Sequence, residues 1–353
     1  MNLIYKAMDS KYFIPETSSV KYALEKLNEL KANIIIFVLD ENGKLIGSVT
    51  DGDIRRGLLK DINLNENVRS VVQENPKYID IDNVNLTEII ELRDSNFKLI
   101  PITKNDIVID LLDFSQRKTI LPVDVVIMAG GKGSRLKPLT ESVPKPLLQV
   151  GDKAIIQHNL DRLLYFGVRN IIISVNYLKE KIYKYFKDHP INQNLSFISE
   201  EKPLGTIGAV SQIENFENEY VLLTNSDLLT NLDYEDFVLN SIKEDADMAI
   251  VTIPYKVDIP YAILEKNRSG LVTSFKEKPT YSYMANAGIY LIKRKYLKLI
   301  PKDTFYNTTD LLQKLISEKK RILSYNFSGY WLDIGKHEDF NRAQEELPKI
   351  NFK

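Results

Sequence analysis

The sequence contains no cysteine, and this absence removes several classes of site at once. A chain without thiols forms no disulfide, binds no metal through thiolates and has no cysteine nucleophile. Histidine is scarce too, with three residues dispersed along the chain, so a histidine metal cluster is not expected. Any metal ion should therefore be a hard cation held by oxygen ligands.

The chain also lacks an excess of either charge, because its formal net charge is −1 at pH 7. Without a basic excess there is no electrostatic footprint for nucleic acid or for an anionic membrane, so neither partner is expected. The longest strongly apolar run, from Ile34 to Leu39, is far too short to cross a bilayer. No apolar signal core follows the first residues, and we expect a cytoplasmic protein.

What is present is an ordinary globular composition, with 44% hydrophobic and 27% charged residues in 353 positions. At about 100 to 200 residues per domain, this length predicts two domains. The stretch 114–122 breaks the periodicity and carries charge and a proline. We therefore predict a first domain at 1–116, a linker at 117–123 and a second domain at 124–353.

The most informative stretch is an apolar run, 125–128, that leads into a loop rich in glycine. Four apolar residues without alternation suit a strand covered on both faces, and three glycines within four positions let the backbone point N–H groups at phosphate oxygens. Arg135 and Lys145 add two cations suited to a polyphosphate. The P-loop string is absent, and the dinucleotide fingerprint lacks its third glycine, since Leu136 stands there.

The string G-G-x-G-S-R-L-x-P-L-T, followed by P-K-P-L-L, resembles the signature of sugar-1-phosphate nucleotidyltransferases. That family joins a nucleoside triphosphate to a sugar 1-phosphate and releases pyrophosphate. From Asp124 onward apolar strands also alternate with helical patterns, which predicts a doubly wound α/β fold with a mixed, mostly parallel, Rossmann-like sheet. The resemblance implies nucleotide contacts at the loop residues Ala129, Gly130, Gly131 and Gly133.

A second string, P-L-G-T-I-G-A at 203–209, resembles the family element that receives the base and ribose. Gly205 would let the base approach closely, and Thr206 is expected to cap the next helix. A plain turn between a strand and a helix, with no ligand, is the alternative.

Two aspartates are expected to hold Mg²⁺. The buried strand predicted within 219–229 ends in the carboxylate of Asp227, and ligands of open α/β sheets bind at the carboxyl edge of the strands. Asp333 lies in W-L-D-I-G, which resembles the element that supplies the second acidic ligand. Ser226 stands where the family usually has glycine, and a helix cap is the alternative role for Asp227.

By the same resemblance, E-K-P and N-A-G elements contact the sugar and its phosphate. They place Glu277, Lys278 and Asn286 in the sugar site, where planar polar groups would read hydroxyls and the ammonium would neutralise phosphate. Tyr261 is followed by Ala262, where relatives often carry glycine, so the depth of this pocket is expected to differ.

The implied reaction is an in-line attack by the sugar phosphate on the α-phosphorus of the triphosphate, with GTP as the expected nucleotide and a GDP-sugar for surface glycans as the product. Arg135 would neutralise the departing pyrophosphate and Lys145 the reacting centre. The expected sugars are mannose-type, heptose or amino-sugar phosphates. A catalytically silent nucleotide sensor and a metal-dependent glycosyltransferase are the alternatives, although the D-x-D of the latter is absent at Asn225-Ser226-Asp227.

The first domain has a different pattern. A helix capped at Ser19, a strand at 33–39, a hairpin turn at 40–44, a returning strand and a helix from Asp51 resemble a CBS domain. The order repeats more faintly from Asn85, which predicts a CBS pair that binds a nucleotide or mediates assembly of a homo-oligomer. Thr50 and Asp53 match the family's T-x-x-D ribose contact, with an ordinary helix cap as the alternative, whereas Asp110 replaces the threonine in the second repeat.

Overall fold

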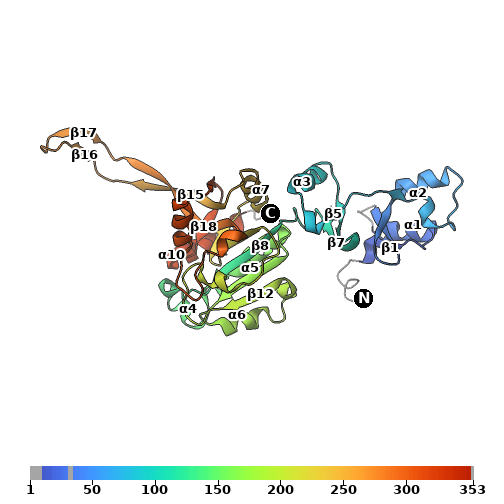
Figure 1. Ribbon diagram of the computed structural model, residues 1–353, viewed down its shortest axis with the longest axis horizontal. Helices are drawn as coiled ribbons and strands as arrows, with labels where there is room; N and C mark the ends of the chain where they lie inside the picture. Colours follow the sequence, from blue (N-terminus) through green and yellow to red (C-terminus); the bar gives the residue numbers. More distant parts are fainter. Residues whose placement is uncertain (1–9, 31–34, 351–353) are drawn as a thin grey trace. The chain divides into compact units, whose positions relative to one another are not determined.

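The computed structural model of the chain describes residues 10–30 and 35–350 (Figure 1). The chain divides into two compact units, Met1–Leu121 and Pro122–Lys353, and the division falls inside the span 117–123 predicted as a linker. Each unit has its own hydrophobic clusters and is described by itself. Within the described residues, no helix combines the length and the apolar character that crossing a membrane requires.

The first half of the first unit is a sheet in the order β1-β2-β3-β4 with two helices. The Ser19 side chain accepts from the backbone N–H of Tyr22 and so caps α1, as the sequence predicts. The predicted strand forms as β2, although Asn33 and Ile34 lie outside the described residues. The elements are α1 (Val20–Glu29), α2 (Asp51–Leu58), β1 (Phe13–Pro15), β2 (Ile35–Leu39), β3 (Leu45–Thr50) and β4 (Gln73–Glu74).

The second half of the first unit repeats the order of strand, helix and hairpin. Asn85 caps α3 by accepting from the N–H groups of Thr87 and Glu88, and Ile89 packs with Ile100 in a small core. The two halves are joined by a backbone hydrogen bond of 3.0 Å from Val108 to Gly43. The elements are α3 (Leu86–Asp94), β5 (Ile79–Asp80), β6 (Leu99–Lys104) and β7 (Ile107–Asp113).

The second unit is built on a seven-stranded sheet in the order β12-β11-β8-β13-β18-β15-β19. β18 runs antiparallel to both of its neighbours, and the other neighbouring pairs are parallel. The predicted mixed, mostly parallel α/β sheet is therefore confirmed. Its strands are β8 (Val123–Ala129), β11 (Asn170–Val175), β12 (Leu195–Ser199), β13 (Tyr220–Asn225), β15 (Met248–Asp258), β18 (Thr280–Lys293) and β19 (Ile322–Asn326).

Helices cover the sheet of the second unit because alternate strand residues present apolar side chains to opposite faces. Val126, Val221 and Leu223 pack with Leu311 and Leu315 of α9 in one cluster. The rings of Phe166 and Tyr234 lie 5.6 Å apart and join the end of α5 to the start of α7. The helices are α4 (Leu139–Ser142), α5 (Ile155–Tyr165), α6 (Lys179–Phe186), α7 (Tyr234–Lys243), α8 (Arg294–Leu297), α9 (Thr308–Ser317) and α10 (His337–Glu346).

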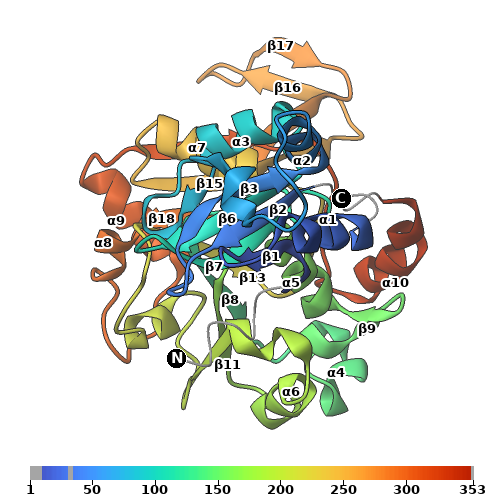
Figure 2. The same cartoon turned by 90° about the vertical axis from the view of Figure 1, so that its right-hand side faces the viewer.

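Three further ribbons complete the second unit. β9 (Gln149–Val150) pairs with β10 (Lys153–Ala154), and β14 (Leu228–Thr230) pairs with β20 (Trp331–Asp333). β15 and β18 continue as a two-stranded ribbon beyond the sheet and lead into β16 (Ile263–Lys266) and β17 (Val272–Lys276). This ribbon, residues 255–284, stands away from the rest of the unit in both views (Figures 1 and 2), and we call it the arm.

Candidate functional site

The site lies where the carboxyl ends of two neighbouring strands meet. β8 ends at Ala129 and opens into the glycine loop, and parallel β13 ends at Asn225, whose register partner is Met128. Parallel neighbours deliver the residues that follow them to one edge of the sheet, so the glycine loop and Asp227 come together. Asp333 arrives from far along the chain because β20 pairs with β14, with Asp333 opposite Leu228.

The four residues predicted to carry the chemistry form one cluster. Lys145 Nζ donates to Asp227 Oδ2 and lies 3.9 Å from an oxygen of Asp333. Arg135 reaches the same place, since a Cβ added to Gly335 would come within 3.4 Å of its guanidinium. One ammonium thus lies between two carboxylates, with a guanidinium beside them.

The electrostatics of the cluster indicate an unmet demand for positive charge. Burial raises the pKa of the Asp333 carboxyl, and the negative Asp227 raises it further, while Lys145 and Arg135 oppose both effects. Asp227 Oδ1 is buried and has no hydrogen-bond partner. An unpartnered buried carboxylate oxygen beside a second carboxylate is an arrangement that a hard divalent cation satisfies. Among the residues described, no group of three or more acidic or histidine side chains is placed to hold a metal ion. Phosphate oxygens would therefore have to complete the coordination.

The glycine loop frames a cavity of about 300 Å³ at this edge. Gly133 has φ of +61°, and a Cβ there would lie 2.9 Å from Thr140, so the loop needs glycine for its own packing. A Cβ on Gly131, by contrast, would meet nothing within 4 Å and would project into open space. Ala129 is buried and offers the site only its backbone. The cavity brings together Gly130, Gly131, Lys145, Gly205, Thr206 and Asp227.

The structure corrects the role expected of Thr206. Its hydroxyl accepts from the N–H of Thr308 at 2.9 Å, so it serves the first turn of α9. The element after it is a short 3₁₀ helix, Gly208–Gln212, whose N-cap is Ile207. Gly205 has φ of +80°, and a Cβ there would lie 2.6 Å from the carbonyl oxygen of Tyr306, so the chain's own packing requires this glycine.

None of the three predicted sugar contacts is among the residues that line this cavity. Glu277 and Lys278 lie on the arm and are exposed, and Asn286 lies where the arm joins the sheet, opposite Thr252. β18 rises about 20 Å from Thr280 to Asn286, and Glu277 and Lys278 come before Thr280 in the chain. The Asn286 amide donates to the Tyr290 hydroxyl at 2.7 Å. That these three residues contact the sugar stays a prediction, since none of them lies on the wall of this cavity.

Glu200 is a site residue that the sequence reasoning passed over, although it begins the string before P-L-G-T. It lines the cavity and is 6% exposed. Its carboxylate accepts from the Ser174 hydroxyl at 2.8 Å and from the N–H of Leu204 at 3.0 Å. A glutamate three positions before a proline carries no signal in a single sequence, so only the fold reveals a buried acceptor at the cavity.

In the first unit, Thr50 and Asp53 form a capping box at the start of α2. The Thr50 hydroxyl donates to Asp53 Oδ2 at 2.6 Å, and Arg56 donates to Asp53 Oδ1 at 2.5 Å. The helix-cap role is thereby present, and nucleotide binding by this pair stays a prediction. In the repeat, Asp110 accepts from Arg117 at 2.9 Å.

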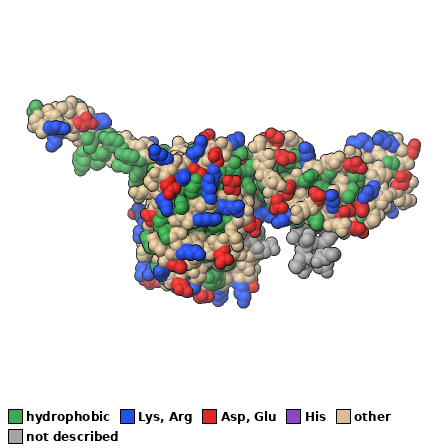
Figure 3. Space-filling view, viewed as in Figure 1, with side chains coloured by type: hydrophobic (Ala, Val, Ile, Leu, Met, Phe, Trp, Pro, Cys, Tyr) green, Lys and Arg blue, Asp and Glu red, His purple; other side chains and the backbone are tan. Residues whose placement is uncertain are grey.

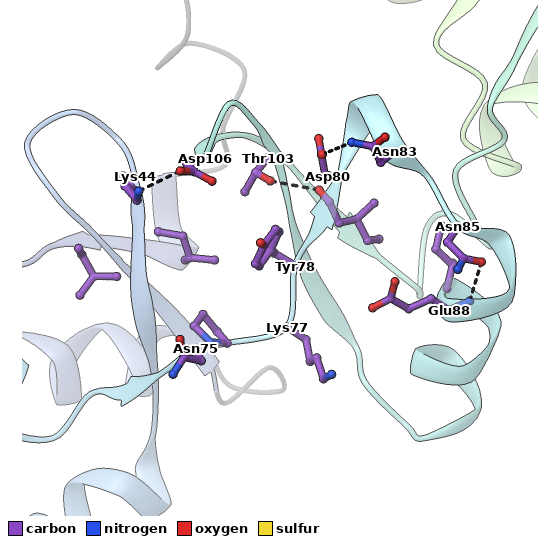
Figure 4. Close-up of a pocket in the computed structure, with 15 residues that line it drawn as sticks. Lys44, Asn75, Lys77, Tyr78, Asp80, Asn83, Asn85, Glu88, Thr103 and Asp106 are labelled. Carbon is purple, nitrogen blue, oxygen red and sulfur yellow. Dashed lines mark hydrogen bonds and ion pairs between the residues drawn. The ribbon is translucent and has the colours of Figure 1, made fainter. Parts of the chain in front are cut away.

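The first unit also contains a cavity of about 530 Å³ between the start of β3 and the segment from β5 to α3 (Figure 4). Lys44 and Asp106 pair at 2.9 Å on its rim, and the Tyr78 ring lies between them and Lys77 in the view. Thr50 and Asp53 are not among the residues that line it.

Comparison with protein families agrees with this division. A model described as nucleotidyl transferase matches residues 124–350, and a CBS domain model matches residues 4–60. The bifunctional protein GlmU of Methanocaldococcus jannaschii is 32% identical over 235 residues, which are 65% of this chain and 55% of that protein. A mannose-1-phosphate guanyltransferase of Pichia angusta is 32% identical over 231 residues, 61% of each chain. The chain thus spans somewhat more than half the length of these curated relatives.

Solved structures show the same likeness. HddC from Yersinia pseudotuberculosis, complexed with GMP-PN, is 30% identical, and the match covers 64% of this chain and 99% of that one with a TM-score of 0.50. A putative glucose-1-phosphate thymidylyltransferase from Bacillus anthracis, in complex with a sucrose, is 23% identical. Its match covers 65% of this chain and 97% of that one with a TM-score of 0.53, and it bears on the fold alone.

Proposed function

Because this chain belongs to the nucleotidyl transferase family, we propose that it joins a nucleoside triphosphate to a sugar 1-phosphate and releases pyrophosphate. The observation that carries the proposal is the cluster of Lys145, Arg135, Asp227 and Asp333 beside the glycine loop. Such a cluster suits phosphoryl transfer, in which catalysis is positioning and neutralisation of charge.

In this reaction an oxygen of the sugar phosphate forms a bond to the α-phosphorus, and the bond from that phosphorus to the bridging oxygen breaks. The leaving group takes the electron pair and departs as pyrophosphate. The attacking phosphate is already an anion at neutral pH, so a general base is not required. Lys145 would neutralise charge at the reacting phosphorus, and Arg135 would neutralise the pyrophosphate.

Asp227 and Asp333 are the residues that would hold Mg²⁺, because their oxygens are hard donors and Asp227 Oδ1 lacks a partner. When bound, the ion supplies charge neutralisation for the phosphate oxygens. The chain's own contribution is to fix the two carboxylates at the ends of paired strands, where Leu228 and Asp333 are opposite each other.

We assign GTP as the triphosphate. Curated relatives include mannose-1-phosphate guanyltransferases, and HddC was solved with GMP-PN. In this chain Glu200 offers a carboxylate at the cavity wall. Guanine presents adjacent N1–H and N2 amino donors, and a carboxylate, which only accepts, complements both. The names of the relatives likewise favour mannose-type sugar phosphates. Heptose and amino-sugar phosphates are the next candidates, with surface glycans as the proposed destination.

The test is release of pyrophosphate from each common triphosphate with Mg²⁺ and a panel of sugar 1-phosphates. We expect GTP with a mannose-type 1-phosphate to give the highest rate. Nucleotide binding without pyrophosphate release would indicate a silent sensor. Release of nucleoside diphosphate from an NDP-sugar would indicate a glycosyltransferase.

One substitution links this activity to the site. Asp227→Asn keeps the size of the side chain but removes the charge that Lys145 and a cation require, so turnover should fall at least about 1,000-fold while the melting temperature changes little. Asp188→Asn is the matched control, because Asp188 is exposed on a turn. Retained activity of Asp227→Asn would contradict the assignment.

A further inference from the structure

The arm exposes large apolar side chains to solvent over much of its length. On one cross-strand pair, Tyr255 and Tyr283 are each 59% exposed, and on another, Leu264 is 58% and Phe275 66% exposed. Figure 3 shows hydrophobic side chains gathered along this ribbon. The full set is Tyr255, Val257, Tyr261, Leu264, Leu271, Val272, Phe275, Tyr283 and Met284.

A two-stranded ribbon of this kind is not expected to be stable without a partner surface. A two-stranded hairpin is marginally stable alone, and its unpaired edges invite pairing with another chain. At roughly 100 Å² for each of these side chains, covering them would bury about 900 Å², close to the 800 Å² per partner of a standard protein interface. The area is therefore enough for a stable dimer.

The arm also carries the two sugar-site residues that its own cavity lacks. Glu277 and Lys278 lie between β17 and β18 on the arm, and neither lines the cavity beside Asp227. β18 runs from the arm to that cavity: four residues after the arm ends at Met284, a Cβ on Gly288 would lie 2.8 Å from the amide of Asn225, a cavity residue. A two-fold contact made near this point would lay the arm of each copy along the site of the other.

Charge complementarity favours a second copy as the partner. The arm contains five lysines or arginines and three carboxylates. α10, which begins two residues after Gly335 at the site, carries four carboxylates and one arginine. An arm with a positive balance would therefore meet an acidic helix at the partner's site.

We propose that the arm docks on a second copy of this chain and delivers Glu277 and Lys278 to the partner's sugar-phosphate site. We call Lys145, Arg135, Asp227 and Asp333 the phosphate cluster. The dimer is isologous, so each of its two sites combines the phosphate cluster of one copy with the arm of the other. The delivery of sugar contacts rests on the proposed function, whereas the docking itself does not.

Mixed dimers test the exchange. Asp227→Asn disables the phosphate cluster, and Glu277→Ala with Lys278→Ala disables the arm, so each variant alone should release little pyrophosphate. Co-expressed in equal amounts, they should recover about a quarter of wild-type activity, because half of the dimers are mixed and each mixed dimer has one intact site. If the wild type is active but the co-expressed variants release no pyrophosphate, the arm serves its own chain and the proposal is overturned.

A second experiment is independent of activity and uses the absence of cysteine. Lys278→Cys on the arm and Phe305→Cys at the cavity are introduced into separately tagged chains, and a short bifunctional maleimide is added. We expect cross-linked heterodimers. A further chain carries both Lys278→Cys and Phe305→Cys; a cross-link within that chain, with none between the separately tagged chains, would place the arm on its own cavity and reject the exchange.

Sedimentation provides the last check on the docking. Leu264→Glu with Phe275→Arg replaces an apolar cross-strand pair by an oppositely charged one, which keeps the ribbon paired while removing its apolar surface. This variant should be at least ten times more dissociated than the wild type, whereas Ile316→Glu, an exposed apolar position on α9, should remain dimeric. A monomeric wild type would overturn the proposal even if pyrophosphate release is observed, and a dimeric wild type without any release would contradict the function alone.

Discussion

At the scale of single residues, the site depends on one ammonium group that interacts with two carboxylates. Lys145 has a side chain that is 11% exposed and contacts Asp227 directly, with Asp333 at 3.9 Å. The raised pKa of Asp333 indicates that Lys145 and Arg135 together do not fully offset the burial of this carboxyl and the charge of Asp227. The cluster is therefore shaped for additional positive charge, which a metal ion would supply.

This reasoning predicts a metal-dependent stability. Lys145→Met should lower the free energy of unfolding by about 2 kcal/mol, less than the roughly 3–5 kcal/mol for breaking a fully buried pair, because the Asp227 side chain keeps 20% exposure. Added Mg²⁺ should raise the melting temperature of this variant more than that of the wild type, since the ion takes the place of the lost ammonium. Thermal melts with and without Mg²⁺ measure both effects.

The control is the double variant Lys145→Met with Asp227→Asn, which removes a carboxylate together with the ammonium. It should lose the extra response to Mg²⁺. An equal response in all three proteins would mean that the ion does not bind at these carboxylates.

A second prediction at this scale concerns the choice of base. Glu200→Gln replaces one acceptor oxygen by an amino donor, which would face the guanine donors instead of accepting from them. We expect kcat/KM for GTP to fall by about 10- to 100-fold, the equivalent of about 1–3 kcal/mol for a bidentate base contact, with a smaller fall for UTP. The ratio of the two kcat/KM values is the measurement.

Ser174→Ala is the matched control for Glu200→Gln. It removes the 2.8 Å hydrogen bond to the Glu200 carboxylate but leaves the carboxylate in place. Loss of positioning should affect every nucleotide alike, so the GTP to UTP ratio should stay near that of the wild type. If both variants changed the ratio equally, Glu200 would act on the loop and not on the base.

At the scale of elements, the glycines of the two loops separate into structural and functional positions. Gly205 and Gly133 have positive φ, and a Cβ on either would come within 3.0 Å of another atom of the chain. Gly131 has neither constraint, since its Cβ would meet nothing. The fold therefore tolerates a side chain at Gly131, and only a ligand would oppose one.

We accordingly predict that Gly131→Ala leaves the melting temperature unchanged but lowers kcat/KM for the triphosphate by about 10-fold or more, because a methyl group would keep phosphates from approaching the backbone. Steady-state kinetics and a thermal melt test the two halves of the prediction. Gly52→Ala adds a methyl to α2, where it would meet the tip of the Arg56 side chain and the Thr50 hydroxyl, and it should leave the kinetics unchanged. Unchanged kinetics of Gly131→Ala would place the phosphates elsewhere.

The same elements show what could be predicted from the sequence. The strands β8 and β13 were predictable because uninterrupted apolar residues specify a strand buried on both faces. β13 ends at Asn225, two residues before the carboxylate at which this strand was expected to end. The role of Thr206 was not predictable, since its partner Thr308 lies 102 positions away. The arm was not predicted for a similar reason: the pattern of a strand in the sequence does not tell whether that strand packs on the core, and β16 and β17 pair with each other instead.

At the scale of the whole molecule, the two units carry different parts of the proposed activity. All four residues of the phosphate cluster and the arm belong to the second unit, Pro122–Lys353, and the predicted nucleotide pair Thr50 and Asp53 belongs to the first. The second unit has its own clusters of buried residues, one over the large sheet and one near β20. Catalysis and assembly through the arm should therefore not require the first unit.

The last prediction follows from this division. A protein of residues 122–353 should fold, remain dimeric and retain kcat/KM within about threefold of the full chain, because it keeps its core, its phosphate cluster and its arm. Any response that the full chain shows to adenine or guanine nucleotide bound at the first unit should be absent from this fragment. Sedimentation measures whether the fragment is dimeric, and pyrophosphate release measures its kcat/KM and its response to nucleotide. Thr50→Ala in the full chain is the companion variant: it loses the cap of α2, at about 1 kcal/mol, and would weaken the nucleotide response without changing basal turnover. A monomeric fragment would instead assign assembly to the first unit, as expected of a module that pairs chains, and an inactive dimeric fragment would show that the first unit supports the site itself.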